Sequence, residues 1–258
     1  MVEPTPRFWE VFFDVYEGLP RQGPGNRANA KRALEMCTDL PPEPAILDLG
    51  CGAGGQTLHL ADLSPGTILA VDNHEPLIRR FNERINESGL AHRITAVTGD
   101  MGDPAFARGK SFDLVWSEGA LYNIGIARAL EVCRGLLRPD GYLVFTDAVW
   151  RRDNAPQEIR ETFDLDYPAM GRVEDILNLI AASAFDLIGH FTLAGEAWWD
   201  DFYTPMEERV RELRSKYAHD PEATATLDTI SREPEMHRRY HEYYAYEFFV
   251  TRATAGRR

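Results

Sequence analysis

The chain has 258 residues, of which 44% are hydrophobic and 27% are charged, so it can bury an ordinary globular core. Its 41 acidic residues outnumber 28 Lys and Arg, and the formal net charge of -13 excludes a general nucleic-acid binder, which needs a concentrated basic surface. Three widely spaced cysteines without a C-x-x-C pair exclude a disulfide framework and a zinc ribbon. Without a signal-peptide pattern or a run of ~20 apolar residues, we expect a cytoplasmic protein with no membrane partner.

Short apolar runs alternate with helical patterns over most of the first 150 residues. Two candidate helices, 7–16 and 28–36, come first and are joined by the loop GLPRQGPGN. Strand and helix then alternate, which indicates parallel pairing in a doubly wound sheet. The apolar runs predict strands at 45–49, 67–71, 94–98, 112–116 and 142–146, with helices at 56–61, 76–88 and 126–137 between them.

The pattern changes after the fifth predicted strand. A helix is expected at 173–184, a sixth strand at 187–193 and a final aromatic strand at 243–251. We therefore divide the chain into an N-terminal helical lid segment, a main domain and a helical insertion before the last strand. Their expected bounds are 1–40, 41–258 and 196–241, respectively.

The loop DLGCGAGG follows the first predicted strand and begins a helix. Its glycines let the backbone turn tightly and approach a ligand, and the helix N-terminus favours an anionic or polar group. Gly50, Gly52 and Gly55 fit the pattern G-x-G-x-x-G, and Asp72 follows at the end of the second strand, where a carboxylate can hold both hydroxyls of a ribose. This pattern alone does not separate a dinucleotide from another adenosine ligand.

Two further acids narrow the choice of ligand. Asp48 lies inside the end of the first strand, two residues before Gly50, at a position that dinucleotide sites usually leave apolar because a bound pyrophosphate is anionic. Asp100, in TGDM after the third strand, stands where a carboxylate could accept the adenine amino group while the Met101 N–H donates to the ring. Acids at three successive strand ends therefore indicate a cationic adenosine ligand.

The motifs ILDLGCGAGG, AVDNHEPL, TGDM and the strand pair FDLVWSEG and GYLVFTDA resemble the class I S-adenosylmethionine-dependent methyltransferases. With RQGPG, WSEGALYNIG and YYAYEFFV, the chain is more narrowly similar to bacterial small-molecule-type methyltransferases. The resemblance implies an α/β Rossmann-like seven-stranded sheet in the order 3-2-1-4-5-7-6, with the last strand antiparallel. It also implies S-adenosyl-L-methionine as cofactor and S-adenosyl-L-homocysteine as product.

Carried over position by position, the resemblance places the donor's methionyl end on the glycine loop, its ribose on Asp72 and its adenine on Asp100. Cys51 lies within that loop, and we expect it to pack there rather than to act as a nucleophile. The implied cofactor-binding residues are Asp48, Gly50, Cys51, Gly52, Asp72, Asn73, Asp100, Met101 and Ser117.

Glu118 and Tyr122, in the stretch SEGALYNIG after the fourth strand, are the candidate catalytic residues. Glu118 is placed to act as a general base, but it could instead cap the turn that follows or bind the donor's ammonium. Tyr122 could orient the acceptor or close its pocket. His237 and His241 stand four apart, as a metal pair requires, but no third ligand accompanies them, so we expect no metal.

The resulting hypothesis is an enzyme that methylates an unidentified small molecule, mainly by positioning the reactants for in-line displacement. An NAD-dependent oxidoreductase and a non-catalytic sensor of S-adenosylmethionine are the alternatives. The cluster WWDDFYTP, residues 198–205, could be a satellite core or a wall of the acceptor pocket. The sequence leaves a homodimer open.

Overall fold

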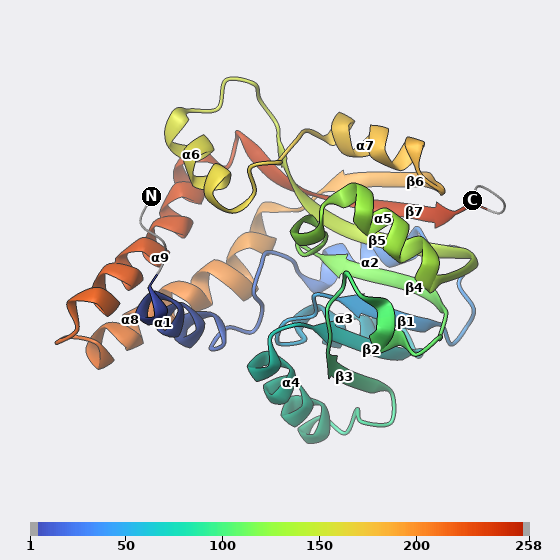
Figure 1. Ribbon diagram of the computed structural model, residues 1–258, viewed down its shortest axis with the longest axis horizontal. Coiled ribbons are helices and arrows are strands. Elements are labelled where there is room, and N and C mark those ends of the chain that lie inside the picture. The colour runs from blue at the N-terminus through green and yellow to red at the C-terminus, as the bar shows by residue number, and fades with distance from the viewer. Residues whose placement is uncertain (1–4, 255–258) are drawn as a thin grey trace.

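The computed structural model describes residues 5–254 and contains a seven-stranded sheet in the order β3-β2-β1-β4-β5-β7-β6 (Figure 1). The first five strands pair in parallel, and β7 runs antiparallel to both β5 and β6. The predicted fold class, sheet order and antiparallel last strand are confirmed. The strands are Ala45–Leu49 (β1), Thr67–Asp72 (β2), Ile94–Thr98 (β3), Phe112–Glu118 (β4), Leu137–Trp150 (β5), Phe185–Thr192 (β6) and Tyr244–Ala253 (β7).

Several helices begin where the sequence provides proline or a side-chain cap. Pro6 starts the first helix, and the Thr5 hydroxyl accepts a hydrogen bond from the Phe8 N–H at 3.1 Å. The helices are Pro6–Tyr16 (α1), Arg27–Glu35 (α2), Gly55–Leu63 (α3), Glu75–Glu87 (α4), Ile126–Leu136 (α5), Gln157–Asp166 (α6), Val173–Ala182 (α7), Thr204–Lys216 (α8) and Pro221–Tyr240 (α9).

Two elements differ from the sequence prediction. Helix α6 was not predicted, because Ile159 is its one buried residue and its sequence carries little apolar periodicity. Strand β5 begins at Leu137, five residues before the predicted start. The chain bulges between Leu137 and Tyr142 opposite β4, and this bulge accommodates the Pro-Asp-Gly sequence that separates the end of α5 from the predicted strand.

The two faces of the sheet belong to separate apolar clusters. Along β1 and β4, Ile46, Leu114 and Trp116 belong to one cluster, whereas Leu47 and Val115 belong to the other. This alternation follows from the period of two residues in a strand. Helices α2, α3 and α4 contribute to the first cluster, together with α1, α6, α8 and α9, and helices α5 and α7 contribute to the second.

Helices α1, α8 and α9 pack together beyond the carboxyl ends of the parallel strands (Figure 1). α8 and α9 lie between β6 and β7 in the chain, as predicted for the insertion. The group stands over the sheet edge at which β1, β2 and β4 end, and that edge is where ligands bind in open α/β sheets. None of the helices between residues 5 and 254 is long and apolar enough to cross a membrane.

Candidate functional site

The glycine loop connects β1 to α3 in a backbone conformation that needs glycine. Gly50, Gly52 and Gly54 have φ angles of 72°, 52° and 80°, in the left-handed region. The N–H groups of Gly50 and Cys51 both donate to the carbonyl of Val71, which fixes the loop against β2. The Cys51 thiol is buried, and burial raises its pKa well above the usual value, so it packs as a neutral group.

The Asp72 carboxylate is fixed between the glycine loop and the start of α4. One of its oxygens accepts the Gly52 N–H and the other accepts the His74 N–H, each at 2.9 Å. Asn73, between these residues, is exposed. The side chain at the end of β2 is therefore oriented by the loop at the end of β1, as their shared sheet edge requires.

Asp48 is fully buried, and its hydrogen bonds go to the start of α3. Its carboxylate accepts a hydrogen bond from the Thr57 hydroxyl at 2.5 Å and a longer one from the Gln56 amide at 3.4 Å. Burial raises the pKa of Asp48 to about 7. Its contacts hold β1 against the first turn of α3, so they support the shape of the loop.

Asp100 and Met101 follow β3 at the same edge. Asp100 is exposed, and one of its oxygens accepts the Gly102 N–H at 2.7 Å. The Met101 methyl group lies 3.6 Å from the point that a Cβ on Gly50 would occupy, and the Ala120 Cβ lies 2.3 Å from that same point. The structure therefore brings together the loop, the end of β3 and the residues after β4.

Ser117 and Glu118 end β4, and the side chains of both form hydrogen bonds within the protein. The Ser117 hydroxyl donates to the carbonyl of Leu49 at 2.8 Å, which ties β4 to β1. The Glu118 carboxylate accepts from the Trp116 indole and forms an ion pair with Arg21, each at 2.8 Å. The side chains of Glu118 and Arg21 are 2% and 3% exposed, so this is a buried ion pair rather than a free carboxylate.

The segment that supplies Arg21 lies directly over the glycine loop. The side-chain oxygen of Gln22 accepts the Ala53 N–H at 2.7 Å, and its amide donates to the Tyr16 carbonyl at 3.0 Å. A Cβ on Gly52 would lie 2.2 Å from the Gln22 oxygen. The RQGPG stretch belongs to the family resemblance, but the sequence predicted no role for Arg21 or Gln22. Their partners lie 97 and 31 residues away, and nothing close to the motif reveals them.

Helix α1 reaches the end of β2 from the same side. Phe13 stacks on the His74 ring with 4.2 Å between centroids, and Glu17 contacts the His74 Nε2 at 2.8 Å. His74 is also the residue whose N–H holds Asp72. The N-terminal helix is thus joined to the donor-site residues that the sequence predicted.

Tyr122 lies in a second group of polar side chains, on the other side of the β4 end. Its hydroxyl donates to Asp166 at 3.2 Å, and its ring lies 4.7 Å from that of Tyr167. The Tyr167 hydroxyl donates to Asp147 on β5 at 2.7 Å. The sequence did not predict this group, because Asp166 ends the unpredicted helix α6 and Tyr167 follows it.

Glu233 of α9 receives two further tyrosine hydroxyls. Tyr16 donates to one oxygen at 2.8 Å and Tyr203 donates to the other at 3.2 Å. Tyr246 on β7 adds another phenol beside β4, since its ring lies 3.1 Å from the point that a Cβ on Gly119 would occupy. A tyrosine-rich region therefore continues from the end of β4 to α1 and α9.

The WWDDFYTP segment contributes mainly to packing. Trp198 and Phe202 are buried in the core, and Asp200 is exposed. His237 stacks on Trp198 at 4.2 Å, and its Nδ1 lies 2.9 Å from the Tyr244 hydroxyl. Burial lowers the pKa of His237 to about 4. Within residues 5–254, no three His, Cys, Asp or Glu side chains are arranged to hold a metal ion.

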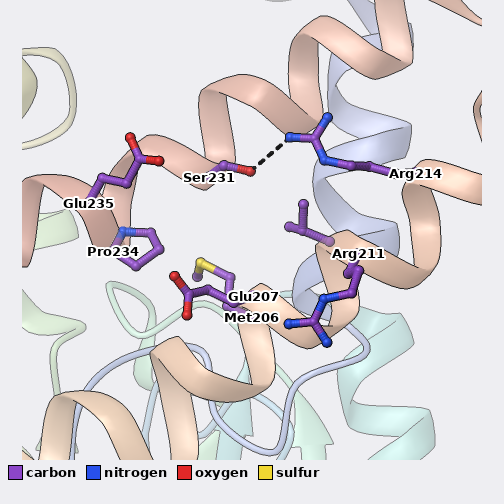
Figure 2. A pocket seen from close by; sticks show the side chains of 8 residues that line it. Met206, Glu207, Arg211, Arg214, Ser231, Pro234 and Glu235 are labelled. Atoms are coloured by element: carbon purple, nitrogen blue, oxygen red, sulfur yellow. Dashed lines mark hydrogen bonds between the residues drawn. The ribbon is translucent and has the colours of Figure 1, made fainter.

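A separate hollow of about 340 Å³ lies between α8 and α9 (Figure 2). Ser231 and Arg214 face each other across it with a hydrogen bond of 3.3 Å, and Glu207 at its wall pairs with Arg238. Its lining comes entirely from α8 and α9. The hollow contains none of the predicted site residues, so we place the functional site at the strand ends.

Comparison with known proteins provides separate information about the carboxyl ends of the parallel strands. A family model described as a methyltransferase domain matches residues 47–145, which include the end of β1, the glycine loop and all of β4. Residues 47–145 therefore carry a methyltransferase domain.

Individual relatives cover different parts of the chain. A glycine/sarcosine/dimethylglycine N-methyltransferase of Actinopolyspora halophila is 33% identical over 139 residues, covering 52% of this chain and 24% of the relative. A sterol 24-C-methyltransferase of Gibberella zeae is 25% identical over 184 residues, covering 67% of this chain and 47% of the relative. The chain thus spans about half, or less, of the length of these curated relatives.

The solved structures match over a larger share of the chain. A SAM-dependent methyltransferase from Geobacter sulfurreducens in complex with S-adenosyl-L-homocysteine superimposes with a TM-score of 0.77 at 20% identity. The match covers 95% of this chain and 98% of that one. At 20% identity, this likeness shows that the two chains share a fold and shows nothing more.

Proposed function

Because the chain belongs to the class I S-adenosylmethionine-dependent methyltransferase family, we propose that it transfers the methyl group of S-adenosylmethionine to a small-molecule acceptor. The observation that carries the proposal is the convergence of the glycine loop, Asp72 and Asp100 at one sheet edge, beside the end of β4. The activity of the whole protein is part of the proposal and not of the comparison, because the curated relatives extend well beyond the matched region.

The residues at this edge fit the donor chemically. A carboxylate has about four acceptor positions, and backbone N–H groups occupy two of those on Asp72. The remaining two can accept a pair of ribose hydroxyls. Asp100 uses one oxygen for the Gly102 N–H and is exposed, so its other oxygen can accept the adenine amino group.

As part of this proposal, we keep the donor-binding roles predicted from the sequence, except that of Asp48. Asp72 and Asn73 would hold the ribose, Asp100 and Met101 the adenine, and the glycine loop the methionyl end. Asp48 would act through the loop, since its carboxylate bonds Thr57 and Gln56. When bound, S-adenosylmethionine supplies a methyl group on a positively charged sulfur.

Positioning is the main contribution that we assign to the protein. Holding two reactants in line contributes about 7–11 kcal/mol in well-oriented systems. The Arg21–Glu118 pair joins the N-terminal segment to the end of β4, which is the strand end between the donor loop and the tyrosine-rich region. We therefore interpret Glu118 as a positioning residue rather than a free general base.

Titration calorimetry tests the donor site. The wild-type protein is expected to bind S-adenosylhomocysteine, and Asp72→Asn should weaken that binding because the amide cannot accept two hydroxyls as a carboxylate does. The matched control is Asp186→Asn, an exposed carboxylate on β6 outside the site. Binding of NAD without S-adenosylhomocysteine would contradict the proposal, and would support the oxidoreductase alternative.

Transfer itself needs a separate measurement. We expect label from methyl-labelled S-adenosylmethionine to appear in small molecules of a bacterial metabolite extract. Tight donor binding with no transfer to any extract would favour the non-catalytic sensor instead.

A further inference from the structure

The tyrosine-rich region beside β4 contains carboxylates, and no Lys, Arg or His among the described residues pairs with them. We define the tyrosine–carboxylate cluster as Tyr16, Tyr122, Tyr167, Tyr246, Asp147 and Glu233. Its members come from α1, β5, β7 and α9 and from the segments that follow β4 and α6, and hydrogen bonds join each carboxylate to at least one tyrosine hydroxyl. Six separate parts of the chain thus direct phenols and acids toward the carboxyl edge of the sheet.

One carboxylate of the cluster is incompletely satisfied. Asp147 is 1% exposed, one of its oxygens accepts the Tyr167 hydroxyl, and the other is buried with no hydrogen-bond partner. Over residues 5–254, neither Asp147 nor Glu233 forms an ion pair within 4.0 Å. A buried carboxylate without a cation costs free energy, and an unsatisfied oxygen adds to that cost. Such a group fits a site whose cation arrives with a ligand.

The carboxylates of Asp147 and Glu233 both lie close enough to Tyr246 to affect its pKa. Burial, followed by the charges of Tyr122, Asp147 and Glu233, raises the pKa of Tyr246 well above its usual value. Tyr246 is itself only half-buried, although β7 lies between β5 and β6 and its neighbour Ala245 is buried. Part of the Tyr246 residue is therefore solvent-accessible in the middle of the sheet, while its hydroxyl is shielded enough for burial to be the main cause of the raised pKa.

The cluster also adjoins the proposed donor site. Tyr246 approaches Gly119, which directly follows the Glu118 that ends β4. Ser117 on the same strand is bonded to Leu49, at the start of the glycine loop. An acceptor held by the cluster would lie next to the strand end that faces the donor.

We propose that the tyrosine–carboxylate cluster binds the ammonium group of an amine acceptor, so that the methylated atom is nitrogen. This inference rests on the proposed function. Carboxylates without a paired arginine or lysine attract a cation and repel a carboxylate or phosphate. Aromatic rings add cation–π attraction, which is about 0.5–2 kcal/mol per contact and grows as water is excluded.

The chemistry of the transfer balances with these groups. The ammonium first gives a proton to a cluster carboxylate, which exposes the nitrogen lone pair. A nitrogen–carbon bond then forms to the methyl group as the sulfur–carbon bond breaks, leaving a neutral thioether and an N-methylated ammonium. The carboxylic acid later returns its proton to water. Asp147, whose pKa burial raises to about 7, suits this exchange at neutral pH.

Binding of a simple cation tests the cluster without knowledge of the acceptor. The probe is tetramethylammonium, compared with the neutral neopentyl alcohol of similar shape, each titrated into the protein saturated with S-adenosylhomocysteine. We expect the cation to bind more tightly than the alcohol. Asp147→Asn and Glu233→Gln should each weaken binding of the cation about tenfold or more, while Asp186→Asn leaves it unchanged.

Two further measurements separate this inference from the proposed function. Affinity for S-adenosylhomocysteine should be the same in wild type, Asp147→Asn and Glu233→Gln, and failure of wild type to bind it would remove the proposed function itself. Labelled methyl transfer should favour primary and secondary amines over phenols and carboxylic acids. Equal binding of cation and alcohol, or transfer confined to phenols or acids with donor binding intact, would overturn the amine assignment.

Discussion

Replacing Glu118 by glutamine separates its two possible roles, because the structure and the sequence lead to different expectations. As a free general base, Glu118 could be changed with loss of turnover but little loss of stability. In the structure, however, its carboxylate is buried against Arg21, and the Nη1 atom of Arg21 already lacks a hydrogen-bond partner. Glu118→Gln would leave the guanidinium charge buried without compensation.

The expected cost is large. Breaking a buried pair by removing one partner costs about 3–5 kcal/mol, a substantial part of the ~5–15 kcal/mol that stabilises a typical domain. For a chain of this length each kcal/mol lowers the melting temperature by about 2–4 °C, so the variant should melt roughly 6–20 °C below wild type. Urea unfolding followed by circular dichroism measures the free-energy change directly.

A double-mutant cycle and an exposed pair provide the controls. Arg21→Met combined with Glu118→Gln should be less destabilised than the sum of the two single variants, because no unpaired charge remains. Asp62→Asn breaks the Arg27–Asp62 pair, whose side chains are 52% and 62% exposed, and should cost no more than about 1 kcal/mol. Wild-type stability in Glu118→Gln, together with lower turnover and unchanged donor affinity, would refute this reasoning and restore the general base.

Three other substitutions test separate contacts. Burial raises the pKa of Asp147 to about 7 in the folded protein, from about 4 in the unfolded chain, so ionisation of Asp147 opposes folding as the pH rises from about 4 to 7. Calorimetric scans should therefore show that Asp147→Asn melts at a higher temperature than wild type at pH 8 and at the same temperature near pH 4. Thr57→Val removes a donor to buried Asp48 and should cost about 1–3 kcal/mol in urea unfolding. Gln22→Ala leaves the Ala53 N–H without its acceptor and should speed amide exchange there, as hydrogen-exchange mass spectrometry would detect; unchanged exchange would contradict the contact.

The sheet and the donor edge were predictable because their evidence is local. Buried strands are visible in the sequence as short apolar runs, and their alternation with helices indicates parallel pairing. The strand order came from the family resemblance, whose motifs also lie at the strand ends. The glycine loop and Asp72 are 20 residues apart, yet both stand directly at predicted strand ends, and the structure joins them by one hydrogen bond. A motif that lies at a predicted strand end can therefore be placed in the fold from the sequence.

The tyrosine–carboxylate cluster could not be predicted in this way. Tyr16 and Glu233 are 217 residues apart, and Arg21 and Glu118 are 97 apart, so no spacing rule links them. Each of these residues looks like an ordinary polar position on an amphipathic helix, in a loop or at a strand end. Their meaning depends on tertiary contacts made by α1, α9 and the unpredicted α6.

The N-terminal segment connects the two proposed sites physically. Gln22 bonds the glycine loop with its oxygen and the Tyr16 carbonyl with its amide, while the Tyr16 hydroxyl bonds Glu233 in the cluster. Arg21 holds the end of β4, which lies between the two sites. Any movement of this segment would therefore change contacts on both sides together. It follows that donor and acceptor affinities should be coupled, each ligand changing the affinity for the other by the same factor, because linkage between binding equilibria is reciprocal.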